Sequence, residues 1–186
     1  MSLRRIARLS CLSLLCGLAF CSYAAAEVPR LSEVEKFKDY RVYYAGSEVG
    51  GYPLETVTES EARRKGRRDA IWDFGYGDCT PAPDSGCSLP ISIQNWSTCQ
   101  RWAGIYPGKP RLFSFHGAKA AWVPTAGSLE VYTGRTTVVI FAWSRGLSES
   151  AARQLRTVHQ EQSPSRLRPP VPGSLRGNLP CQLNPR

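Results

Sequence analysis

Apolar and polar residues alternate most clearly in the last third of the chain, where we expect a β-sheet. The predicted strands cover residues 112–115, 120–123, 129–132 and 136–143. Glycines and a Thr-Gly pair separate them at the spacing typical of hairpins. The last of the four is apolar on both faces, which predicts a central strand covered from both sides.

Weaker patterns upstream predict further elements. Residues 41–45, 54–58, 70–76 and 89–94 are β-branched, aromatic or alternating, and we expect strands there. Ser32 with Glu35 forms a capping-box pattern that predicts a short helix over 33–38, and Ser97 marks one or two helical turns over 96–102. The highly charged residues 59–69 indicate an exposed loop or a frayed helix. Ser148 is expected to cap a last helix over 149–157.

These elements predict an α+β fold: an antiparallel sheet of five to seven strands, with the C-terminal helix packed on one face and disulfides as staples. The length of 186 residues suits one domain with tails. We place that domain at 27–159. Residues 160–186 are rich in Pro and Arg and contain no aromatic residue, so we expect an extended tail.

The first 26 residues resemble an export signal. Arg4, Arg5 and Arg8 precede an apolar run of about a dozen residues, and small residues end at Ala26. The run is too short for the roughly 20 residues that span a bilayer. We therefore expect cleavage after Ala26 and a secreted protein, or one outside the cell on its envelope. A lipid-anchored form at Cys21 ranks lower because Phe20 is not the small residue that such a site needs.

Removal of this segment leaves the cysteines at 79, 87, 99 and 181. An even number in an exported chain favours disulfides over metal binding or free thiols. Three pairings are possible. We favour Cys79 with Cys87, which closes a short loop rich in Pro, Gly and Asp, and Cys99 with Cys181, which ties the tail to the domain.

Two stretches resemble a pattern found in uncharacterised exported proteins of actinobacteria. One is Phe74-Gly75-Tyr76-Gly77-Asp78-Cys79-Thr80-Pro81, continued by residues 86–90 and 93–99. The other is Leu129-Glu130-Val131-Tyr132-Thr133-Gly134-Arg135 with residues 136–139. The resemblance covers about 40–155. It implies a shared exported α+β domain and no particular activity, ligand or catalytic residue.

The formal net charge is +9, and five positive charges lie close together in the sequence, at Arg63, Arg64, Lys65, Arg67 and Arg68. Such a run attracts anionic polymers and lipid head groups, although many charge runs are only solvated. Because export argues against nucleic acid as the partner, we expect an anionic envelope polymer or a membrane surface.

No nucleophile elbow, metal-ligand spacing or phosphate loop is present in the sequence, so we assign no catalytic residue, metal or cofactor. Our first hypothesis is a non-enzymatic binding or structural module. The alternative is a small secreted hydrolase with His116 as general base, near Ser114 and either Asp73 or Asp78. The aromatic residues mostly suit a core, but Trp96, Trp102 and Trp143 fall at strand ends, where they could line a carbohydrate or hydrophobic groove.

Overall fold

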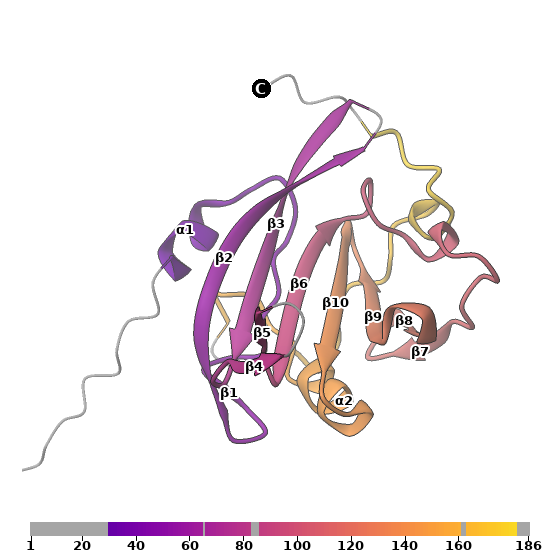
Figure 1. The fold of residues 1–186 in the computed structure, drawn as a ribbon. Helices are drawn as coiled ribbons and strands as arrows, with labels where there is room; N and C mark the ends of the chain where they lie inside the picture. The colour runs from indigo at the N-terminus through magenta and orange to yellow at the C-terminus, as the bar shows by residue number, and fades with distance from the viewer. Residues whose placement is uncertain (1–29, 65, 83–85, 161–162, 182–186) are drawn as a thin grey trace, which may run out of the picture.

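A computed structural model describes residues 30–64, 66–82, 86–160 and 163–181. Among these residues, eight strands form one antiparallel sheet in the order β1-β2-β3-β6-β10-β9-β8-β7. The sheet curls into half of a barrel (Figure 1). Its strands are β1 (Glu48–Val49), β2 (Tyr52–Arg64), β3 (Arg67–Tyr76), β6 (Ile91–Ser97), β7 (Phe113–Phe115), β8 (Ala118–Val123), β9 (Ser128–Thr133) and β10 (Thr136–Ala142).

The remaining elements are short. β4 (Thr80–Ala82) and β5 (Gly86–Ser88) form a separate hairpin. The helices are α1 (Leu31–Lys36), α2 (Arg145–Arg153) and the 3-10 turns η1 (Ala103–Ile105), η2 (Pro124–Ala126) and η3 (Ser174–Arg176). The expected α+β architecture with a mainly antiparallel sheet is therefore confirmed, but eight strands replace the predicted five to seven.

The charged residues 59–64 and 67–69 belong to strands and not to the predicted loop or frayed helix. They extend β2 and β3 into a long hairpin that projects beyond the other strands (Figure 1). Cross-strand pairing continues to Arg64 opposite Arg67. Charged side chains at the edge of a sheet are compatible with strand structure because they point into solvent and discourage pairing with other chains. Their density concealed the strand in the sequence.

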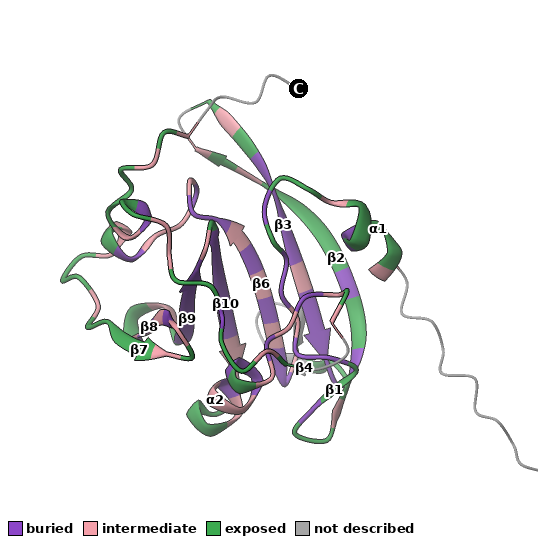
Figure 2. Cartoon of the chain, turned by 180° about the vertical axis from the view of Figure 1, so that it is seen from behind, coloured by how far each residue is buried: buried purple, intermediate pink, exposed green. Residues whose placement is uncertain are grey.

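One face of the sheet, the core face, carries the main hydrophobic cluster. Phe74, Tyr76, Ile93, Val131 and Val138 are fully buried there. Alternation along β3, β6, β9 and β10 places these side chains on the same side, as the strand pattern predicts. Figure 2 shows these four strands mostly in purple beside the green outer strand β2.

The extended segment 40–45 helps to cover the core face, which differs from the prediction. Residues 41–45 are not a strand of the sheet. The Asn95 side chain accepts from Tyr43 N (2.7 Å) and donates to Tyr43 O (2.8 Å), while Tyr44 pairs its backbone with Arg156. The buried residues of the segment then pack on the sheet as part of the core.

The predicted C-terminal helix begins earlier in the chain than expected, at Arg145, and it lies at the end of the sheet instead of on one face. Ser144, not Ser148, is its N-cap, because the Ser144 hydroxyl accepts from Leu147 N (3.2 Å). α2 sits at the end of the sheet where β10 stops (Figure 1), and its buried Ala151 and Ala152 reach the core there. Similarly, the helix expected at 33–38 is Leu31–Lys36, and the turns expected at 96–102 begin only after β6 ends at Ser97.

The segment 163–181, named the strap here, runs back over the domain. Leu167 and Ser174 are buried, and the Cys99–Cys181 disulfide fixes its end. This bond confirms one predicted pairing. Its sequence separation of 82 residues corresponds to at most about 4.5 kcal/mol in the chain-entropy account of cross-linking. Cys79 is also disulfide-bonded. The predicted partner Cys87 belongs to β5, but its side chain lies outside the described residues.

Candidate functional site

A cavity of about 840 Å³ lies beside the core, and we call it the cationic groove. Four separate parts of the chain line it. They are α1 with the following segment up to Tyr43, the β9–β10 turn, residues 157–160 after α2, and the strap at 168–171. A volume of this size falls within the range of roughly 300–1,000 Å³ that is typical of small-molecule sites.

The groove takes its name from its charged side chains. Lys38, Arg41, Arg135 and Arg168 line it, together with the exposed imidazole of His159. Lys38 Nζ donates to the Glu35 carbonyl oxygen (3.0 Å), and the three arginines make no ion pair with any described residue. No carboxylate occurs among the described lining residues. The four cations therefore face solvent without a counter-charge from the described part of the groove.

The floor of the groove is rigidly held. The Thr133 hydroxyl donates to the Arg168 carbonyl oxygen (2.8 Å) and lies 3.4 Å from the Tyr43 hydroxyl. Tyr43 is itself clamped by the fully buried Asn95 described above. These bonds join the segment before the sheet, strand β9 and the strap. The backbone of Arg168, and the segments next to Arg41 and Arg135, are thus held in place by bonds within the protein.

The strap completes the groove through the β9–β10 turn. Gly134 N donates to Pro169 O, Val171 N donates to Gly134 O, and both distances are 3.1 Å. Gly134 has a φ of 55°, which suits the tight turn and keeps the backbone close to the strap. Arg168 consequently reaches the same cavity as Arg135, although the two residues belong to different segments.

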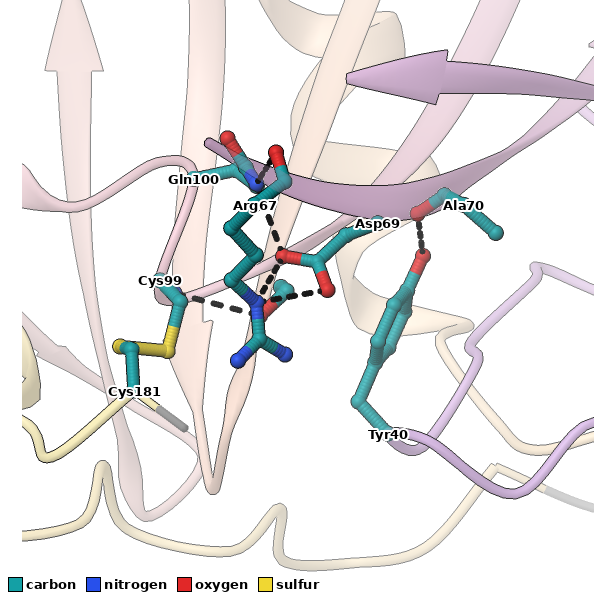
Figure 3. Close-up of polar contacts among 8 residues, drawn as sticks. Tyr40, Arg67, Asp69, Ala70, Cys99, Gln100 and Cys181 are labelled. Carbon is teal, nitrogen blue, oxygen red and sulfur yellow. Dashed lines mark hydrogen bonds and ion pairs between the residues drawn. A yellow bond between two sulfur atoms is a disulfide. The ribbon is translucent and has the colours of Figure 1, made fainter. Parts of the chain in front are cut away.

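A smaller cavity of about 300 Å³ continues the cationic groove toward the Cys99–Cys181 disulfide, and Tyr40 and Arg135 line both. Arg67 and Asp69 lie at this end (Figure 3). Arg67 Nε donates to both carboxylate oxygens of Asp69 (2.8 and 2.7 Å), and Gln100 Nε2 donates to one of them (3.0 Å). Burial, reinforced by the charge of Asp69, raises the pKa of Tyr40 far above its usual value. Tyr40 is therefore a neutral hydrogen-bond donor here.

The predicted basic run lies at the tip of the β2–β3 hairpin, and its members have different surroundings. Arg63 pairs with Glu61 (3.1 Å), and the Arg64 guanidinium carbon lies 4.4 Å from the centre of the Trp102 ring. Arg67 is held by Asp69, Arg68 is exposed, and Lys65 lies outside the described residues. The binding role predicted for Arg63, Arg64, Lys65, Arg67 and Arg68 remains a prediction. The cationic groove, by contrast, was not predicted, because its cations are scattered through the sequence.

A second polar cluster that sequence reasoning missed lies on the opposite face of the sheet. Glu130 is completely buried, and its carboxylate accepts from Arg101 Nε (2.8 Å), from Tyr106 and from Tyr132 (2.7 Å). Burial, together with the charge of Glu130, raises the pKa of both tyrosines well above the usual value. The only signal in the sequence was an acidic residue within an otherwise apolar strand.

A third cluster on this face surrounds Asp73. Ser92 donates to Asp73 Oδ1 (2.8 Å), Gln94 donates to Oδ2 (3.1 Å), and Trp96 Nε1 donates to Gln94 (3.2 Å). Burial raises the pKa of the Asp73 carboxyl, and the hydrogen bonds from Ser92 and Gln94 partly oppose this effect. The chain of bonds links β3 to β6 across the sheet.

His116 lies in the β7–β8 turn with an exposed ring packed edge-on against Phe115 (4.7 Å between ring centres). In the described part of the chain its ring hydrogen-bonds to no carboxylate or hydroxyl, and Ser114 instead accepts from Lys119. The hydrolase hypothesis gains no support from this geometry. Trp143 is 53% exposed, whereas Trp96 and Trp102 are half-buried.

The described residues include no group of three or more His, Cys, Asp or Glu side chains that could hold a metal ion. Nor do they form a helix long and apolar enough to cross a membrane. The predicted export signal, with Cys21 and Ala26, falls outside the described residues.

Comparison with known proteins finds no match for the chain among protein-family models, curated proteins or solved structures. The resemblance to exported actinobacterial proteins therefore stays a prediction, and the candidate function depends on the site itself.

Proposed function

We propose that this protein is an exported binding module that holds an anionic polymer of the cell envelope in the cationic groove. The observation that carries the proposal is the meeting of Lys38, Arg41, Arg135 and Arg168 around one cavity that has no described carboxylate. Like charges brought together repel one another, so an arrangement without a counter-charge is stabilised when an anion binds.

The extent of the basic surface favours a polymer over a single small anion. Arg135 borders both the cationic groove and the cavity beside the disulfide, where Arg67 is paired with Asp69 and where Asp39 also lies. A chain of phosphates or carboxylates can contact several of the basic side chains around the cationic groove at once, and each contact releases counterions. The export signal and the disulfides are consistent with a ligand outside the cytoplasm.

The test measures binding of inorganic polyphosphate, a soluble probe with regularly spaced negative charges, at several salt concentrations. We expect Arg41→Ser, Arg135→Ser and Arg168→Ser together to weaken binding by roughly a factor of 100, because each basic side chain contributes about 1 kcal/mol near an anionic surface. The slope of log affinity against log salt should fall by about three units.

The matched control removes the same charge elsewhere, with Arg63→Ser, Arg68→Ser and Arg111→Ser, all exposed arginines outside the groove. This variant should keep most of the affinity. If it loses the affinity while the groove variant keeps it, the hairpin is the binding surface and the groove proposal is wrong. Binding only to vesicles with anionic lipid, and not to polyphosphate, would point to a membrane instead of a polymer.

A further inference from the structure

A second cavity, of about 610 Å³, lies on the sheet face opposite the core, and we call it the aromatic groove. It opens between the tip of the β2–β3 hairpin and the loop 98–112, which crosses this face. Ile71 of β3 and Trp96 of β6 line it from the sheet, and Arg101 and Tyr106 line it from the loop. It shares no lining residue with the cationic groove.

Two half-buried aromatic side chains give this groove its walls. The Arg101 guanidinium carbon lies 5.2 Å from the centre of the Trp96 ring and 5.6 Å from that of Tyr106, within the range of cation–π contact. Trp and Tyr combine a large apolar body with a polar edge, so they suit ligands that present both apolar and polar surface. Trp96 is further fixed by its hydrogen bond to Gln94.

Arg101 is positioned by a charge beneath the groove. Its Nε and Nη2 both donate to Glu130 Oε1, and the Glu130 side chain is fully buried. Arg101 Nη1 makes no hydrogen bond to a described residue. The Arg101 side chain is also 16% exposed, so a ligand can reach it. A guanidinium that is already fixed and retains unused N–H donors loses little conformational freedom when it binds a ligand oxygen.

The aromatic groove holds fewer uncompensated charges than the cationic groove, because of its three lining arginines only Arg64 has no described carboxylate partner. Arg63 pairs with Glu61 at the rim, and Arg101 pairs with Glu130 below. Arg64 stacks on Trp102. The groove therefore offers aromatic surface, fixed N–H donors and the carboxylate acceptor of Glu61, without a strong net charge that would select an anion.

We propose that the aromatic groove binds a neutral oligosaccharide, whose C–H faces pack on Trp96 and Tyr106 and whose hydroxyls accept from Arg101 and donate to Glu61. Sugar rings present apolar C–H faces and a hydroxyl perimeter, which match the aromatic walls and the polar groups of this cavity. The inference does not depend on the proposed polymer binding, since the two grooves lie on different sides of the sheet.

The test uses the full chain and the indole N–H signals of its five tryptophans in two-dimensional NMR. Tetrasaccharides of glucose, mannose, galactose and N-acetylglucosamine are titrated separately at millimolar concentrations. With at least one of them, we expect a saturable shift of the indole signal of Trp96, which lines the groove. The signals of Trp72, Trp122 and Trp143 should remain in place. No saturable shift with any of the four, or a shift centred on Trp143, would overturn the proposal.

Variants add a second measurement. Trp96→Ala should weaken binding of the responding tetrasaccharide by about tenfold, because it removes one aromatic wall. Trp143→Ala removes an exposed tryptophan outside the groove and should bind as the parent does. The cationic-groove variant with Ser at 41, 135 and 168 should also retain saccharide binding, which separates this proposal from the preceding one. Unchanged binding by a folded Trp96→Ala protein contradicts the inference.

Discussion

Arg101 and Glu130 form an ion pair in which the acid is completely buried and the base is 16% exposed. Arg101 belongs to the loop 98–112 and Glu130 to strand β9, so the pair fastens the loop to the sheet. Tyr106 of the same loop donates to the same carboxylate, and the Thr137 hydroxyl of β10 donates to the Arg101 carbonyl oxygen (2.7 Å). The loop thereby forms one side of the aromatic groove.

Replacing Arg101 with Met should lower the free energy of unfolding by about 3–5 kcal/mol, because Glu130 would stay buried without its cation. Urea denaturation at neutral pH measures the loss. Arg153→Met is the control, since it breaks the exposed pair with Glu149 and should cost less than about 1 kcal/mol. If both variants lose the same small amount of unfolding free energy, Arg101 contributes little to stabilising the buried Glu130 carboxylate.

The approach of the strap to the β7–β8 turn gives a second prediction. A Cβ added at Gly117 would lie 2.8 Å from the Leu167 carbonyl oxygen and 2.5 Å from Arg166 Cγ. Gly108 has a similar positive φ, 84° against 86°, but its added Cβ would meet no atom within 4 Å. Gly117→Ala should therefore destabilise the fold by about 1–3 kcal/mol more than Gly108→Ala, through overpacking against the strap.

Thermal and urea unfolding of the two alanine variants provide the comparison. Because the backbone strain of a left-handed residue is present in both, the difference between them reports the contact with the strap alone. Indistinguishable variants would show that the strap moves away from the turn at little cost.

A third prediction concerns the pH dependence of stability at Asp73. Burial raises the pKa of this carboxyl above its usual value of 3.8, so the folded state binds the proton more tightly than the unfolded state. The resulting contribution to stability is complete below pH 3.8 and is lost as the pH rises through the folded-state pKa. The Asp73→Asn variant has no carboxyl to titrate at this position, so its stability does not fall with pH for this reason.

The stability difference between Asp73→Asn and the parent should accordingly shift in favour of the variant as the pH rises from about 4, and then reach a plateau. Unfolding free energies from urea titrations at several pH values measure it. A flat difference, or a shift in favour of the parent, would indicate that the hydrogen bonds from Ser92 and Gln94 outweigh the cost of burial.

Periodicity in the sequence located most of the strands. The segments 70–76, 129–132 and 136–143 alternate, or are apolar throughout, because side chains of a strand point to opposite faces. The structure places β3, β9 and β10 there. Periodicity failed at 59–69, where closely spaced and mostly exposed charged side chains removed the apolar signal. It also failed at 41–45, where strand-like residues find their hydrogen-bond partners in Asn95 and Arg156 instead of a neighbouring strand.

The candidate sites were much less visible in the sequence. The dense run at 63–68 attracted attention, whereas the cationic groove draws on Lys38, Arg41, Arg135 and Arg168, which no local pattern connects. The buried Glu130 was similarly hidden, because alternation assigns its face but does not reveal that the loop 98–112 covers it.

The sequence by itself determined the sheet-rich character of the domain and the approximate position of its strands, since these depend on local alternation. It only favoured Cys181 as the partner of Cys99 among three possible pairings, and the structure shows that bond. Only the tertiary structure decided the strand order, the return of the strap and the assembly of two grooves. The physical reason is that these features arise from contacts between residues far apart in the chain, whose geometry depends on how the whole sheet curls and is closed by its loops.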